Sequence, residues 1–199
     1  MTRSGPDTRL VYIKYFAFAS NLVPYAAAPW ADVKYIEHMQ PTRRVFLASA
    51  LAAPTPKKTV AAIVTTYYPR SHADVIAGRI LEGYSPDNVR TEPRTRIVSM
   101  YTAQIAPKDM SRALAAKHGF RIYPTVAEAV TLGTGKLAVD AVLLVGEHGD
   151  YPTNERGQKL YPRFDLYQRI IEVFRRSRRS VPVFCDKHLS WSWEKASAT

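Results

Sequence analysis

Five short apolar segments alternate along the chain with stretches in which apolar residues recur at helical spacing. The apolar segments cover residues 60–66, 96–102, 120–123, 140–145 and 181–184, and the first is rich in β-branched side chains. Runs of this length are typical of buried parallel strands. The pattern therefore predicts an α/β fold with a doubly wound, mainly parallel sheet, joined by right-handed crossovers.

Capping residues indicate where several of the predicted helices begin and end. Ser71 and Thr125 each precede a helical pattern, and both residue types are preferred at helix starts. Gly119 follows a helical pattern, where a left-handed terminator is expected. Pro182 removes a backbone donor from the last apolar segment, which predicts a strand at the edge of the sheet or the start of a strand.

The N-terminal part of the chain has the layout of an export signal. A twin-arginine pair, Arg43 and Arg44, precedes a short apolar stretch, and residues 50–52 offer a small-residue cleavage site. Because such a signal belongs at an N-terminus, we predict that translation starts at Met39. The protein is then exported to the periplasm or beyond, and it is cytoplasmic if the signal is not functional.

This interpretation divides the chain into three parts: an upstream extension of residues 1–38, an export signal and linker of residues 39–56, and a folded domain of residues 57–199. The extension is expected to be disordered or loosely packed. The alternative is that the apolar and aromatic residues 10–30 form a real helix or a membrane-proximal segment. Lys14 and two prolines interrupt that run, and the signal itself is shorter than the roughly 20 residues that span a bilayer. We therefore predict no stable membrane span.

Composition supports a globular domain and argues against nucleic-acid binding. Hydrophobic residues make up 46% of the chain, which is enough for a core. The net charge of +11 is concentrated in a few runs such as residues 175–179 at a helix end, and no aromatic residues are interleaved with them. The single cysteine, Cys185, excludes an intrachain disulfide and a cysteine metal cluster.

Polar residues follow the last two predicted strands. Residues 146–150 come after the fourth strand and residues 186–188 after the fifth. Parallel sheets bind ligands at the carboxyl ends of their strands. The sequence therefore predicts a nucleotide or small-molecule site at that edge.

Three stretches carry a family resemblance. Residues 111–120, 123–129 and 139–145 together resemble the Rossmann half of the glucose–fructose oxidoreductase/inositol dehydrogenase (Gfo/Idh/MocA) family. The resemblance covers residues 60 to about 195 and implies a Rossmann-like domain of an NAD(P)-dependent oxidoreductase acting on a sugar or polyol. It also implies that Lys187, in the place of the family's Glu-Lys-Pro lysine, is catalytic and that His188 supports it.

The resemblance further implies NAD or NADP as cofactor, although the family's glycine turn is replaced by residues 65–70. Thr102 stands where the family has an acidic residue for the ribose. The residues expected to contact the cofactor are Thr66, Tyr67, Arg70, Ser71, Thr102, Glu147 and Asp186.

Several neighbouring side chains have more than one interpretation. Tyr67 and Tyr68 could stack on a base or sugar, or pack against protein. His72 could touch a phosphate or act in capping the helix start. Glu147, His148 and Asp150 offer metal ligands, but no second histidine lies at ligand spacing on a shared helix face, so we predict no metal site.

Two functional hypotheses follow. The first is an oxidoreductase domain in a truncated or degenerate form, because the family's second domain is absent from the chain. The second is a non-catalytic binding or partner protein of the same fold that has lost nucleotide binding together with the glycines. Both hypotheses are compatible with a homo-oligomer.

Overall fold

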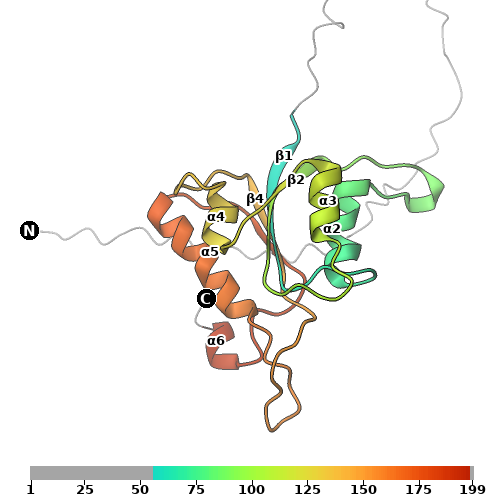
Figure 1. Cartoon of the computed structure of the whole chain (residues 1–199). Coiled ribbons are helices and arrows are strands. Elements are labelled where there is room, and N and C mark those ends of the chain that lie inside the picture. Colours follow the sequence, from blue (N-terminus) through green and yellow to red (C-terminus); the bar gives the residue numbers. More distant parts are fainter. Residues whose placement is uncertain (1–55, 198–199) are drawn as a thin grey trace, which may run out of the picture. The chain divides into compact units, whose positions relative to one another are not determined.

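The fold is a five-stranded, all-parallel sheet with the strand order β3-β2-β1-β4-β5, which confirms the predicted α/β class (Figure 1). The computed structural model describes residues 56–197, so the predicted extension and residues 42–54 of the export signal lie outside the described part. The strands are β1 (Lys58–Val64), β2 (Thr95–Thr102), β3 (Arg121–Ile122), β4 (Ala141–Val145) and β5 (Val183–Cys185).

Helices cover both faces of this Rossmann-like sheet. In Figure 1, α2 and α3 lie on one side and α4 and α5 on the other. A short 3₁₀ turn, η1, lies in the connection to β2, and α6 follows β5. The bounds are α2 (His72–Glu82), η1 (Pro86–Asn88), α3 (Ser111–His118), α4 (Val126–Thr131), α5 (Arg163–Ser177) and α6 (Trp193–Ser197).

Strand β1 is buried on both faces because its side chains alternate between two cores. Ala61 and Ile63 pack toward α4 and α5, whereas Ala62 and Val64 pack toward α2 and α3. This period of two is the geometry of an extended strand. The chain builds β2 and β3 on one side of β1 and then crosses from β3 to β4 on the other side, so a topological switch point lies between β1 and β4.

The predicted caps are confirmed. The Ser71 hydroxyl accepts a hydrogen bond from the Asp74 N–H at 3.2 Å, and the Thr125 hydroxyl accepts one from the Glu128 N–H at 3.1 Å. Gly119 ends α3 in the left-handed conformation, with φ at 71°. The strand after Pro182 is the edge strand β5. Within residues 56–197, no helix combines the length and the apolar character needed to cross a membrane.

Asp140 joins the start of β4 to the start of β1. Its carboxylate accepts hydrogen bonds from the backbone N–H and the hydroxyl of Thr59, each at 2.9 Å. The backbone bond first, then the hydroxyl bond and the charge of Lys58, hold the pKa of Asp140 below its usual range. The ionised carboxylate therefore stabilises the folded protein more than the protonated carboxyl does.

We expect Asp140→Asn to reduce the free energy of unfolding at neutral pH, and the difference from the wild type to shrink in acid. The contribution is complete above the unfolded pKa of about 3.9 and is lost as the pH falls through the lower folded pKa. Urea unfolding from neutral pH to about pH 2 measures this difference. Thr59→Val keeps the backbone donor and should show a smaller effect of the same shape; a difference independent of pH would contradict the assignment.

Candidate functional site

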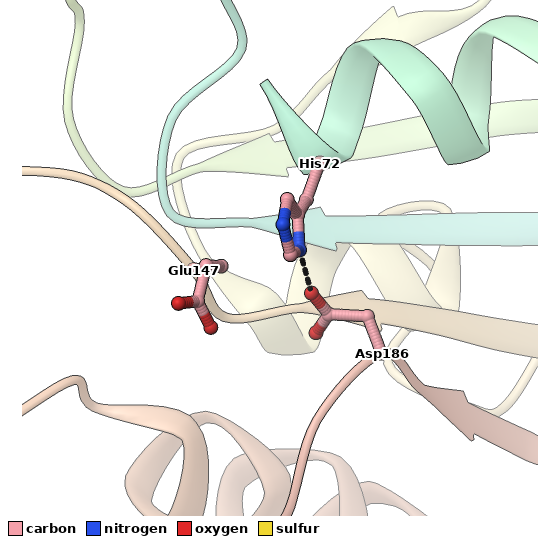
Figure 2. A group of neighbouring side chains, drawn as sticks. All are labelled: His72, Glu147 and Asp186. Carbon is pink, nitrogen blue, oxygen red and sulfur yellow. Dashed lines mark hydrogen bonds and ion pairs between the residues drawn. The ribbon is translucent and has the colours of Figure 1, made fainter. Parts of the chain in front are cut away.

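Three segments meet at the carboxyl edge of the sheet, beside the switch point. They follow β1, β4 and β5, and each contributes one side chain to the group in Figure 2. His72 is the first residue of α2, Glu147 lies two residues after β4, and Asp186 directly follows β5. This edge is where parallel sheets bind ligands, so the location agrees with the sequence-based prediction.

His72 and Asp186 form a direct pair across 114 residues of sequence. The His72 Nδ1 atom lies 2.9 Å from the Asp186 Oδ2 atom, and the other carboxylate oxygen accepts the Gly146 N–H at 3.3 Å (Figure 2). The Asp186 side chain is 2% exposed and that of His72 is 36% exposed. The buried carboxylate thereby orients a partly exposed imidazole, an arrangement that leaves the second ring nitrogen for a ligand.

Arg163, the first residue of α5, is buried beside this pair with its side chain 4% exposed. Its Nη1 donates to the Glu147 Oε2 at 2.9 Å, and its Nη2 lies 3.2 Å from the His188 Nε2. Its guanidinium also lies over the Tyr161 ring, 5.3 Å from the centroid. One arginine thus connects the segments that follow β4 and β5.

Gly146 gives Arg163 the space to reach this position. A Cβ built on Gly146 would lie 2.1 Å from the Arg163 Cγ, far inside van der Waals contact. Only a residue without a side chain fits beneath the arginine stem. The end of β4 therefore needs glycine for a packing reason.

His148 closes one side of the group. Its ring makes edge contacts with the rings of His72, at 5.0 Å between centroids, and Tyr68, at 5.6 Å. Burial first, and then the neighbouring charge of His72, lower the pKa of His148. Its Nε2 atom is shielded from solvent and has no hydrogen-bond partner within the described residues.

The turn after β1 does not fit the pyrophosphate of a dinucleotide. Tyr67, fully buried, packs in the core beneath α2 instead of lining a site. The N–H groups of Arg70 and Asp74 already donate to side chains of the same turn, and the acceptor for Arg70 is the Asp74 carboxylate at 2.7 Å. A helix N-terminus that is occupied by its own carboxylate repels a second anion.

Thr66 and Thr102, the two threonines expected to contact a cofactor, lie close to the carboxyl edge of the sheet. Thr66 is 3% exposed, and its hydroxyl and that of Thr102 are buried without a partner in the described part of the chain. Beyond Thr102, the Gln104 amide donates to the Asp150 carbonyl at 2.9 Å and accepts the Asp150 N–H at 2.8 Å. These two hydrogen bonds join the segment after β2 to the segment after β4.

The structure brings some of the predicted site residues together and leaves others apart. Glu147 and Asp186 lie in the group, and His188 is connected to it through Arg163. Lys187 is exposed; its backbone bonds to the Cys185 thiol, and its ammonium group makes no hydrogen bond or ion pair within residues 56–197. Arg70 is also exposed, and Ser71 acts as the cap of α2.

Sequence reasoning missed the pairing of His72 with Asp186 and the burial of Arg163. His72 was considered only for phosphate contact or capping, and an arginine at a helix start is expected to be solvated. The one available signal was topological. Residues that begin the helix after β1 and residues that end β4 and β5 must meet at the same edge of the sheet.

The comparisons with known proteins add no relative to this picture. The family resemblance therefore stays an expectation from sequence, and the geometry of the site carries the functional argument. No protein-family model, no curated protein and no solved structure matches the chain.

Proposed function

We propose that this Rossmann-like domain binds a hydroxyl-rich small molecule of sugar or polyol type at the switch point between β1 and β4. The observation that carries the proposal is the His72–Asp186 pair, in which a carboxylate 2% exposed holds a partly exposed imidazole at 2.9 Å. The free ring nitrogen of His72 accepts or donates a hydrogen bond to a ligand hydroxyl. The family resemblance supports the same class of ligand.

The surroundings of the pair suit an uncharged ligand better than a phosphate. Glu147 and Asp186 bring two carboxylates to the site, the buried Arg163 is already paired with Glu147, and the exposed Lys187 is a second cation nearby. The carboxylates repel a phosphate, whereas hydroxyl groups can donate to carboxylate oxygens. The aromatic edges of Tyr68 and His148 add apolar surface for a sugar ring.

The second candidate is the NAD(P)-dependent oxidoreductase that the resemblance implies. Its support is the strand order together with the place of Asp186, Lys187 and His188 directly after β5. Because the turn after β1 offers no cradle for pyrophosphate, the proposed function includes no step through a dinucleotide.

We expect the full chain to bind myo-inositol or D-glucose, and His72→Ala to weaken that binding at least about tenfold. The loss corresponds to one hydrogen bond to an oriented imidazole. Saturation-transfer NMR detects binding, and calorimetry measures the dissociation constants. Retention of wild-type affinity in His72→Ala would overturn the proposal.

A matched control comes from the surface pair of His118 and Glu82. The His118 Nε2 lies 2.7 Å from the Glu82 Oε1, away from the sheet edge, so His118→Ala should leave the affinity unchanged. Titration with NADH and NADPH distinguishes the second candidate. Millimolar or tighter dinucleotide binding that weakens in Arg70→Ala would favour the oxidoreductase.

A further inference from the structure

The group of His72, Glu147 and Asp186 combines ligand types that first-row divalent metals accept. One ring nitrogen of His72 and one carboxylate oxygen from each acid lie within 4.8 Å of one another. Imidazole suits zinc, and carboxylates suit manganese, so the donor set favours a transition metal over magnesium. This set differs from the Glu147, His148 and Asp150 combination that was considered from sequence.

The spacing is close to that of a metal shell. Metal–ligand bonds of about 2.0–2.2 Å place tetrahedral ligand atoms about 3.4 Å apart. The His72 Nδ1 and the Asp186 Oδ2 are already 2.9 Å apart, and the whole triad fits within 4.8 Å. To close the shell, the Glu147 carboxylate would have to move toward the other two ligands while it stays paired with Arg163.

Other side chains orient the two carboxylates from behind. Arg163 donates to the Glu147 Oε2, and the Glu147 Oε1 makes no hydrogen bond within residues 56–197. The Gly146 N–H donates to one oxygen of Asp186. Metal ligands are commonly fixed by such outer partners. They leave Oε1 of Glu147 for the ion, and at Asp186 the ion would take the place of the hydrogen bond between Oδ2 and the His72 Nδ1.

Two further observations point to a cation. The Asp186 carboxylate is 2% exposed, and its direct partners are the His72 ring and a backbone N–H, neither of which is a fixed positive charge. A buried carboxylate is expected to be paired or metal-bound. In addition, the shielded His148 Nε2 has no hydrogen-bond partner within residues 56–197, and the His148 ring lies 5.0 Å from that of His72.

We propose that His72, Glu147 and Asp186 bind one divalent transition-metal ion such as Zn²⁺ or Mn²⁺. Three protein ligands leave coordination positions open, as in catalytic metal sites. The inference deepens the proposed function, because hydroxyl groups of a bound sugar or polyol would occupy those open positions.

The test is a titration of the chelator-treated full chain with Zn²⁺ and Mn²⁺, without any sugar. We expect one ion per chain and an upward shift in the melting temperature that grows with metal concentration. His72→Ala and Glu147→Gln should each weaken binding more than about 100-fold, since even the loss of an outer partner costs 10–100-fold. The d–d absorption of Co²⁺ should disappear in the same variants.

Controls keep the metal inference separate from the sugar proposal. His118→Ala and Glu82→Gln alter a histidine–carboxylate pair elsewhere on the surface and should not change metal affinity. Metal binding that survives His72→Ala and Glu147→Gln, or no stoichiometric binding of either ion, would overturn the inference. Sugar binding without metal binding would leave the proposed function standing, and metal binding without sugar binding would remove only the proposed function.

Discussion

Arg163→Met is expected to lower the free energy of unfolding by about 2–4 kcal/mol, because it strands the Glu147 carboxylate without its counter-charge. The Arg163 side chain is 4% exposed and that of Glu147 is 20% exposed, so solvent compensates little for the lost ion pair. Methionine keeps most of the apolar stem over Gly146. Urea unfolding at neutral pH measures the loss.

A double-mutant cycle separates the charge pair from the packing of the stem. Glu147→Gln removes the carboxylate, so Arg163→Met combined with Glu147→Gln should recover most of the loss seen in Arg163→Met alone. The expected coupling between the two positions is about 2 kcal/mol. Additive effects of the two substitutions would mean that the pair itself contributes nothing to stability.

Gly146→Ala is expected to be the most damaging single-methyl change in the described part of the chain. The new Cβ would lie 2.1 Å from the Arg163 Cγ, and the arginine is held at its other end by Glu147 and His188. Relief requires either the arginine or the end of β4 to move, which costs about 2–3 kcal/mol as overpacking. Thermal unfolding should show a fall of roughly 5–15 °C.

Gly78→Ala is the matched control, since it adds the same methyl group inside α2. The nearest atoms to the new Cβ would be Asp74 Oδ1 at 3.6 Å and the Tyr67 hydroxyl at 3.9 Å, which are ordinary contacts. Alanine favours a helix interior over glycine by about 0.8–1.0 kcal/mol, so this variant should be more stable than the wild type. Equal effects of Gly78→Ala and Gly146→Ala would contradict the close contact at Arg163.

The fold could be predicted largely because its signals are local. Continuous apolar runs gave the five strands, Ser71 and Thr125 gave two helix starts, and Pro182 placed the last strand at the edge. The sequence boundaries shift by a few residues, most visibly in β3, which is only Arg121–Ile122. Its ladder with β2 is limited to two residue pairs, and a propensity pattern does not contain that information.

The candidate site could be predicted only as a location. The carboxyl ends of β4 and β5 follow from strand order, so Glu147 and Asp186 were expected at one edge of the sheet. Their partners His72 and Arg163 were not expected there. His72 lies 114 positions from Asp186 in the sequence, and Arg163 is buried although arginine is mostly exposed in proteins. Such contacts depend on the geometry of the crossover connections, which local periodicity does not predict.

The Gln104–Asp150 connection makes the loops that follow β2 and β4 depend on each other structurally. The side-chain amide of Gln104 forms hydrogen bonds as a peptide group would, since it donates to the Asp150 carbonyl and accepts from the Asp150 N–H. Asparagine would fall one methylene short, and glutamate would place an acceptor against the Asp150 carbonyl. Because strands β2 and β4 lie on either side of β1, a change at Gln104 reaches the segment that carries Glu147. A substitution at Gln104 is therefore expected to loosen the loop after β4 as well as its own loop.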